Sequence, residues 1–407
     1  MVEILRKDFN ITHLVGGEKN SGAFKGANLL HNDLLKYNIN SKIIYDEQNT
    51  KIKLLKSKIR QSIEKLPKIL YPKRQNTSFS SSIVGYNFFD DKTYINSNVI
   101  HLHWINNGFF NISHLKKIDK PIVWTIRDMW PFTGGCHYSL GCEKFISNCN
   151  HCPQLSSNKN FDLSTFIQKR KKKYYNDKIK FVVNSNWMKK MASKSSLLKN
   201  FEILTFFPSF DLNNFYEDDD KKFYNSLKIN SKKKIILYGA QNIEAKYKGF
   251  KYFLECLDHL DKEKYMIIFF GNFWNEKVLK EKNIEFLNLG FIKDQNIQRK
   301  IFNLANVFVA TSLQEGFPKT VVESLLCKTP IVYFKETAIE DICENKKIGG
   351  YGANYCDSKD LANGIKWITE NNVKVNEIID KAIFKIKNEF NSEKLIKKYI
   401  ELYNSLI

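Results

Sequence analysis

Two glutamates with a spacing that could serve one ligand, Glu315 and Glu323, stand eight positions apart. Glu315 lies in the loop after an apolar, strand-like run, and Glu323 lies in the helical pattern that follows. Backbone N–H groups of residues 316–319 fall at the expected helix start, where unpaired donors favour an anion, and Gly316 lets a ligand approach closely. The helix carboxylate can accept from a diol, as acidic residues do for ribose. The alternative is a solvated Glu315 and a Glu323 that only complements the helix dipole.

A second candidate for anion binding is the loop Lys246-Tyr247-Lys248-Gly249, between an expected strand at 234–238 and a helix from Phe250. Lysines in a strand-to-helix loop suit a diphosphate. A glycine-bearing loop at 16–23, which includes Gly22, occupies the same place after the first expected strand. Such a loop suits a pyrophosphate, but by itself it is weak evidence.

Strand and helix patterns alternate through both halves of the chain, which predicts an α/β fold with buried parallel strands. The first helix is expected to turn Leu29, Leu30, Leu34 and Leu35 inward, and residues 163–176 are expected to form a helix with a solvated basic cluster at 169–173. Ser185 or Asn186 is expected to cap the following helix. The expected strands are 10–15, 41–45, 98–104, 121–127, 179–183, 234–238, 265–270, 284–287, 307–310 and 331–334.

The composition describes a large, basic chain. Its 407 residues predict two or more domains of ~150 residues. The net charge of +21 is compatible with nucleic acid, an anionic membrane or phosphate-bearing substrates, or with a lysine-rich surface that has no specific partner. The sequence contains no nucleic-acid-binding motif, which argues against that partner. Without a signal-peptide pattern or an apolar run of membrane-spanning length, we expect a cytoplasmic protein.

Four cysteines fall within one short segment at C-x₅-C-x₆-C-x₂-C spacing, namely Cys136, Cys142, Cys149 and Cys152. In a cytoplasmic chain, four neighbouring thiols favour a tetrahedral Zn²⁺ site over disulfides. His137 and His151 could compete as ligands. The alternative is a set of reduced structural thiols, because this is not a standard zinc-finger spacing. A metal with four protein ligands has no open position and would be structural.

Residues 50–74 combine an apolar stripe at helical spacing with many lysines, and Pro67 is expected to end or kink the helix. A basic amphipathic helix can lie on an anionic membrane. The alternative is an ordinary surface helix with solvated lysines. The stripe consists of Ile52, Leu55, Ile59, Ile63, Leu66 and Leu70.

The stretch 315–323 resembles the E-x₇-E signature of the retaining glycosyltransferases of family 4, here as E-G-F-P-x-x-x-x-E. The resemblance implies that Glu315, with Gly316 and Phe317, faces the donor sugar and that Glu323 holds the nucleotide ribose. Lys248-Gly249 is similar to the family's K-G element. This implies that Lys248 binds the donor phosphates, with Lys246 as its basic partner.

Two further segments carry the resemblance. Residues 20–23 resemble the family's S-G-G-A loop, with Ser21 where glycine is usual, and imply a donor contact at Gly22. The run WTIRDMWPFTGGCHY at 124–138 resembles a segment of one bacterial branch, which usually has histidine in place of Arg127. In the wider family that histidine touches the donor sugar. Arg127 can donate hydrogen bonds to a hydroxyl or phosphate, but it cannot act as a base.

The resemblance implies a GT-B fold, with two doubly wound Rossmann-like domains facing a central cleft. The acceptor-side domain is expected at 1–206, the nucleotide-sugar-binding domain at 207–390, and a helix at 391–407 that crosses back to the first domain. The expected linker at 204–215 keeps Pro208, Asp211 and Phe215 of the family's interdomain motif.

The implied activity is transfer of a sugar from a nucleotide-sugar donor to a saccharide or lipid-linked saccharide, with retention, in surface polysaccharide synthesis. The implied reaction needs no divalent metal, and the implied location is the cytoplasm, peripheral on the inner face of the cell membrane. Two alternatives stay open: a non-catalytic sugar- or polyanion-binding protein, and another GT-B enzyme such as a nucleotide-sugar epimerase.

Overall fold

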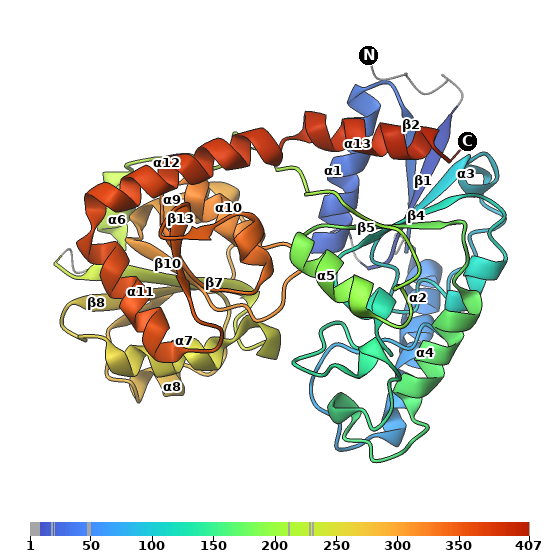
Figure 1. The fold of residues 1–407 in the computed structure, drawn as a ribbon, viewed down its shortest axis with the longest axis horizontal. Helices are drawn as coiled ribbons and strands as arrows, with labels where there is room; N and C mark the ends of the chain where they lie inside the picture. The colour runs from blue at the N-terminus through green and yellow to red at the C-terminus, as the bar shows by residue number, and fades with distance from the viewer. Residues whose placement is uncertain are drawn as a thin grey trace. The chain divides into compact units, whose positions relative to one another are not determined.

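The structure is a computed structural model, and it describes residues 9–17, 19, 21–46, 50–210, 212–227, 229 and 232–406. Asp211 of the expected linker, and Glu18 and Asn20 of the first loop, lie outside the described residues. The chain divides into two compact units (Figure 1). Unit 1 comprises Met1–Pro208 and Ser392–Ile407, and unit 2 comprises Ser209–Asn391. These limits lie within two residues of the boundaries expected from the sequence.

Unit 1 contains a parallel sheet of six strands in the order β2-β1-β3-β4-β5-β6. The strands are β1 (Asn10–Val15), β2 (Asn40–Tyr45), β3 (Val99–Leu102), β4 (Ile122–Ile126), β5 (Ile179–Val183) and β6 (Ile203–Thr205). The helices are α1 (Gly22–Lys36), α2 (Lys51–Lys65), α3 (Lys92–Ile95), α4 (Leu163–Tyr174), α5 (Asn186–Lys194) and α13 (Ser392–Asn404), with a 3₁₀ turn, η1 (Leu66–Leu70), directly after α2.

The last helix, α13, completes one core of unit 1. Its side chains Leu395, Ile396, Tyr399 and Tyr403 pack against strand residues such as Val99 and Val123 in one buried cluster. The other face of the sheet carries a second, aromatic-rich cluster around Trp124 and Phe181. Both faces are therefore covered, as buried parallel sheets require.

Unit 2 contains a seven-stranded sheet in the order β12-β13-β11-β10-β7-β8-β9, with parallel pairing at each junction. The strands are β7 (Lys234–Asn242), β8 (Tyr265–Asn272), β9 (Phe286–Asn288), β10 (Val307–Ala310), β11 (Ile331–Phe334), β12 (Glu344–Asn345) and β13 (Gly349–Ala353). The helices are α6 (Lys221–Ser226), α7 (Phe250–Cys256), α8 (Lys277–Lys280), α9 (Gln295–Leu304), α10 (Lys319–Leu326), α11 (Ser358–Glu370) and α12 (Asn372–Glu389).

The expected α/β class is confirmed, and so is Ser185 as the cap of α5, where its side chain accepts from the N–H of Met188. Two predictions about side-chain exposure are wrong. Leu35 of α1 is 46% exposed rather than inward. Lys171, expected on a solvated face, is fully buried. Its ammonium donates hydrogen bonds to backbone carbonyls inside unit 1, which makes this burial possible. No helix among the described residues has the length and apolar content needed to cross a membrane.

Candidate functional site

In unit 2, the loop after β10 brings Glu315 to Lys248. The Lys248 ammonium forms an ion pair with Glu315 Oε1, and Ser312 Oγ donates to the same oxygen at 3.0 Å. Both charged side chains are largely shielded from solvent. Burial disfavours the charged lysine, but the Glu315 carboxylate outweighs this effect, so the pKa of Lys248 lies above its ordinary value. Lys248 is therefore charged at neutral pH.

The backbone around Lys248 is fixed by an unusually close approach. Gly249 has a φ of +67°, and a Cβ there would lie 2.1 Å from the carbonyl oxygen of Thr311. The Thr311 hydroxyl in turn donates to the Lys248 carbonyl at 2.8 Å. Only glycine fits this position, so the loops after β7 and β10 are locked together and present Lys248 and Glu315 side by side.

Glu323 lies on α10 and has a different partner from Glu315. Its Oε2 accepts from Gln298 Nε2 of α9 at 3.2 Å. Burial raises the pKa of Glu323, and the nearby Lys319 only partly opposes that effect. Helix α10 begins without a side-chain cap, because Pro318 precedes it. Its first N–H groups therefore keep the capacity to meet an anion.

The other expected donor contacts of unit 2 lie in the same loops. Lys246 is exposed two residues before Lys248. Gly316 is buried. The Phe317 ring packs between those of Phe210, at a tilt, and Phe390, edge-on, with centroid distances of 5.5 and 5.4 Å. In unit 1, Gly22 is exposed at the first position of α1, and the Ser21 side chain caps that helix by accepting from the N–H of Phe24.

Arg127 follows β4 in unit 1 and ends a chain of hydrogen bonds between buried groups. Its Nη2 donates to His103 Nδ1 at 3.2 Å, and His103 Nε2 lies 2.9 Å from His13 Nδ1. His13 Nε2 is 3.0 Å from Ser41 Oγ, which is 2.7 Å from His31 Nδ1. A guanidinium can only donate, so the links from Arg127 through His103 and His13 to Ser41 have a fixed direction. His103 and His13 must then both carry their proton on Nε2.

The buried histidines His13, His101 and His103 are neutral. Burial, and then the neighbouring His31 and Arg127, lower the pKa of His13 to about 3. Burial likewise places the pKa values of His101 and His103 well below the ordinary value. The ligand atoms of these three residues lie within 4.8 Å of one another. However, each ring nitrogen has a hydrogen-bond partner and Arg127 repels a cation, so the cluster is better described as a hydrogen-bonded network than as a metal site.

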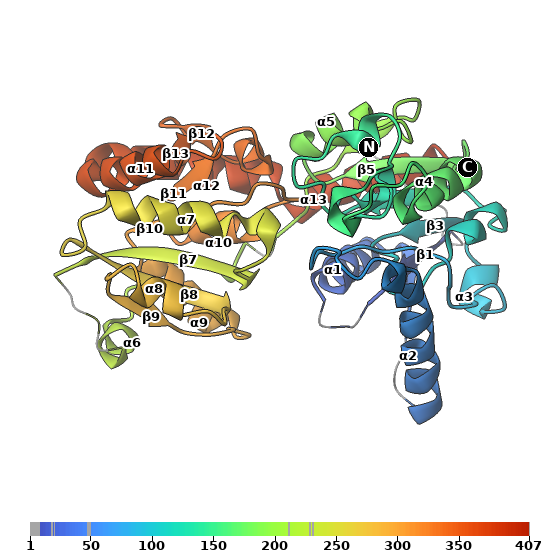
Figure 2. The same ribbon diagram turned by 90° about the horizontal axis from the view of Figure 1, so that it is seen from below.

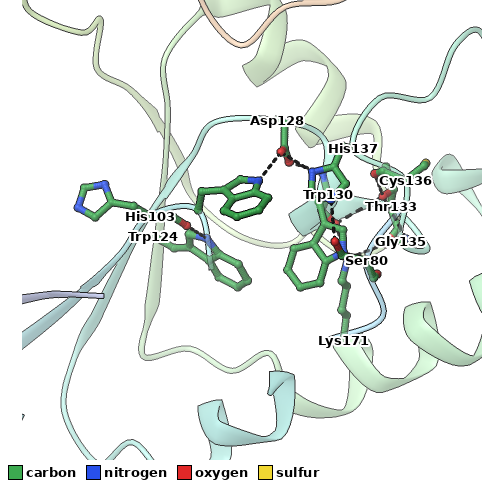
Figure 3. Close-up of polar contacts among 11 residues, drawn as sticks. Ser80, His103, Trp124, Asp128, Trp130, Thr133, Gly135, Cys136, His137 and Lys171 are labelled. Carbon is green, nitrogen blue, oxygen red and sulfur yellow. Dashed lines mark hydrogen bonds and ion pairs between the residues drawn. The ribbon is translucent and has the colours of Figure 1, made fainter. Parts of the chain in front are cut away.

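The loop after Arg127 is organised by Asp128 (Figure 3). Asp128 Oδ2 accepts from Trp104 Nε1 at 3.0 Å and lies 2.6 Å from His137 Nδ1. His137 Nε2 lies 2.9 Å from Ser80 Oγ, which ties a distant loop to the same point. Because His137 is engaged on both ring nitrogens, it is not available as the competing metal ligand that the sequence suggested.

Lys171 supports the same loop from α4. Its ammonium donates to the carbonyls of Trp130 and Thr133, and it lies 3.5 Å from the centre of the Trp130 ring. Burial lowers the pKa of Lys171 to about 7, against the opposing influence of Cys136, Cys149 and Asp128. Neither the burial of Lys171 nor the histidine network was predicted from the sequence. A lysine within a basic run and single histidines on strands carry no local signal of burial.

The four cysteines of the expected zinc site gather around one place. All four thiols are free, and all four residues line one cavity of about 20 Å³. That volume is about the size of one water molecule. Among the described residues, the ligand atoms of the three histidines lie within 4.8 Å of one another, whereas the cysteine sulfurs are not gathered this closely. Metal binding would therefore require the thiols to turn further toward the cavity.

Part of the second half of the chain is similar to a known protein family. Residues 219–385 match the family model "Glycosyl transferases group 1". The chain is 27% identical over 198 residues to the N,N'-diacetylbacillosaminyl-diphospho-undecaprenol alpha-1,3-N-acetylgalactosaminyltransferase of Campylobacter jejuni, covering 47% of this chain and 50% of that protein. The chain spans half or less of the length of the curated relatives it matches.

Solved structures match the whole chain in fold. Sucrose-phosphate synthase from Thermosynechococcus elongatus superposes with a TM-score of 0.67 at 14% identity, over 98% of this chain and 99% of that chain. Anabaena Alr3699/HepE, solved in complex with UDP and glucose, gives a TM-score of 0.60 at 15% identity, over 98% and 100% of the two chains. These likenesses confirm the GT-B class of the fold.

We expect the buried histidines to make unit 1 lose stability in acid. Their pKa values are lowered in the folded state, so below about pH 6.5 the unfolded chain binds protons that the folded chain does not. Replacing His13→Gln should therefore flatten the fall of unfolding free energy with pH by up to ~1.4 kcal/mol per pH unit. Urea titrations at stepped pH measure this slope.

The matched control for this measurement is His259→Gln, because His259 is exposed in unit 2. Its slope should equal that of the unchanged protein. Identical slopes for His13→Gln and the unchanged protein would mean that His13 binds its proton equally well in the folded and unfolded states.

Proposed function

Because residues 219–385 match the group 1 glycosyl transferase family, we propose that this protein is a retaining glycosyltransferase. It moves a sugar from a nucleotide-sugar donor to a saccharide or lipid-linked saccharide in surface polysaccharide synthesis. The observation that carries the proposal is Lys248 held against Glu315 beside the uncapped start of α10. Two likenesses support the substrate classes: the Anabaena neighbour was solved with UDP, and the Campylobacter relative is named for a diphospho-undecaprenol substrate.

The ion pair supplies a mechanism for handling the leaving group. When the donor binds, its diphosphate competes with Glu315 for the Lys248 ammonium, and the N–H groups at the start of α10 and Lys246 add to the positive field. The bond between the anomeric carbon and the diphosphate oxygen breaks, and a bond to the acceptor oxygen forms on the same face. The acceptor proton passes to the departing phosphate oxygen. Glu315, released from Lys248, is then free to contact the donor sugar.

Glu323 has the properties of the ribose contact. Its Oε2 already accepts a hydrogen bond from Gln298, and its other oxygen can accept from a ribose hydroxyl. Burial disfavours its charge, so hydroxyl donors that replace water around the carboxylate are strongly favoured. Catalysis in this scheme uses cationic side chains and needs no divalent metal.

Arg127 takes the place of the usual histidine as a hydrogen-bond donor to a sugar hydroxyl or phosphate. His103 fixes one side of the Arg127 guanidinium, and the buried Nε of Arg127 has no hydrogen-bond partner among the described residues.

The absence of a basic histidine is also the observation that favours the second candidate, a non-catalytic sugar- or polyanion-binding protein. A nucleotide-sugar epimerase is a third candidate, and acceptor-dependent product formation separates it from a transferase. We place the protein in the cytoplasm, at the inner face of the cell membrane.

Loss of either partner of the ion pair should abolish most turnover. We expect Lys248→Ala and Glu315→Ala each to lower kcat by ~10²–10³, since each removes an electrostatic contact to the reacting donor. The assay is acceptor-dependent release of nucleoside diphosphate, after a thermal-shift screen of UDP-, GDP- and ADP-sugars selects the donor. The control is Lys359→Ala, an exposed lysine of α11. A chelator should leave turnover intact. Donor binding without any turnover in the unchanged protein would favour the non-catalytic candidate.

Gly26→Ala tests the role of Arg127 without removing it. A Cβ at position 26 would lie 2.6 Å from Arg127 Nη1, so the guanidinium must move. The alanine itself favours α1 by up to ~1 kcal/mol, so we expect little change in melting temperature but at least ~10-fold lower kcat/KM. Asn32→Ala, at an exposed position of the same helix, is the control. Full activity in a Gly26→Ala protein would remove Arg127 from the donor contacts.

We also propose that Cys136, Cys142, Cys149 and Cys152 hold a structural Zn²⁺, on the basis of their spacing and their shared cavity. Purified protein should contain about one equivalent of zinc by elemental analysis, and Cys142→Ser should lower that content and the melting temperature. Cys356→Ser, in unit 2, should change neither. A content below about half an equivalent would identify the four residues as reduced structural thiols.

A further inference from the structure

Helix α2 is oriented with its polar side toward the protein. Ser57 and Glu64 are its buried residues. Ser57 Oγ and Arg60 Nη2 each donate to the Asp46 carboxylate at 2.5 Å. The Glu64 carboxylate accepts from the N–H groups of Ser81 and Ser82 at 2.6 and 2.7 Å. The helix is therefore anchored to unit 1 through buried hydrogen bonds and an ion pair rather than through an apolar face.

A close backbone contact fixes this orientation. Gly108, at a φ of +74°, lies against the middle of α2, and a Cβ there would be 2.9 Å from the carbonyl carbon of Arg60. The Arg60 guanidinium also lies 5.5 Å from the centre of the Tyr86 ring. The helix cannot turn its apolar side inward without breaking these contacts, so the outward direction of that side is built into the fold.

The apolar stripe of α2 and η1 consequently faces solvent. This is the reverse of an ordinary surface helix, which buries its apolar face. Figure 2 shows α2 extending away from the strands of its own unit. The exposed fractions are 68% for Ile52, 59% for Leu55, 49% for Ile59, 36% for Ile63, 53% for Leu66, 67% for Ile69 and 79% for Leu70. A continuous stripe of this kind marks an interaction surface.

The charges around the stripe indicate the kind of partner. Every exposed charged side chain of α2 is a lysine, because its one acidic residue, Glu64, is buried. By helical spacing, Lys56 borders one edge of the stripe, and Lys51 and Lys58 border the other. Two copies of this surface would bring like charges together, which disfavours self-association. An anionic surface with an apolar interior complements both features.

We propose that the exposed face of α2 and η1 is the surface by which this protein lies on an anionic lipid bilayer. The aliphatic side chains enter the acyl boundary and the lysines meet the lipid headgroups. The role of this membrane contact rests on the proposed function, because a lipid-linked acceptor is presented at a bilayer. The binding itself follows from α2 alone and is measured without any substrate.

The test is co-sedimentation of the full chain with vesicles of phosphatidylcholine alone or with about 30 mol% phosphatidylglycerol. We expect binding to the anionic vesicles only. The triple variant Ile52→Ser, Leu55→Ser, Ile59→Ser should bind at least ~10-fold more weakly. Each of Lys51→Gln, Lys56→Gln and Lys58→Gln should weaken binding by roughly fivefold. The control is Val373→Ser with Phe384→Ser, which removes two apolar side chains that are still more exposed, from α12 of unit 2.

Three results would overturn the proposal. The unchanged chain could fail to bind anionic vesicles, the triple variant could bind as well as the control, or light scattering could show a dimer that only the triple variant loses. The last result would make the stripe a self-association surface. Turnover with a soluble acceptor, measured on the same variants, should be unchanged. A protein that binds vesicles but turns over no donor would contradict the proposed function but would still support the membrane-binding surface.

Discussion

The contact between Gly249 and the Thr311 carbonyl is the constraint on which the chemistry of unit 2 depends. It fixes the loops after β7 and β10 against each other at the carboxyl edge of the sheet. Lys248 and Glu315 are thereby paired before any ligand arrives, and the attraction of Glu315 outweighs the cost of shielding the Lys248 charge from water. A site arranged in this way needs little reorganisation when an anion replaces the carboxylate.

Unit 1 uses a different solution for its buried polar groups. The neutral side chains of His13 and His103 are hydrogen-bonded to each other, to Arg127 at one end and, through Ser41, to His31 at the other. Asp128 and Lys171 then hold the loop that follows β4 from two sides. Each hydrogen bond in such a network offsets part of the cost of removing a polar group from water. These bonds make the orientation of Arg127 depend on residues from several strands.

The sequence predicted ten of the strands described, and it predicted the loops at 246–249 and 315–319 as places for an anion, because strand periodicity and strand-end loops are local features. It did not predict β6, β12 or β13, which are short or, for β13, rich in glycine. Lys171 looked solvated because its neighbours are lysines, and only the tertiary structure supplies its carbonyl partners. The stripe of α2 was visible as a pattern, but the direction it faces depends on Asp46, Ser81 and Gly108, which are distant or unremarkable in sequence.

The return of α13 to unit 1 affects how the chain is made. The face of the first sheet that carries Ile11, Val99 and Val123 is covered by residues from the far end of the chain. During synthesis at ~5–20 residues per second, all of unit 2 emerges before that cover exists, which leaves the face open for roughly 10 to 40 seconds. Unit 1 is thus begun before unit 2 and completed after it.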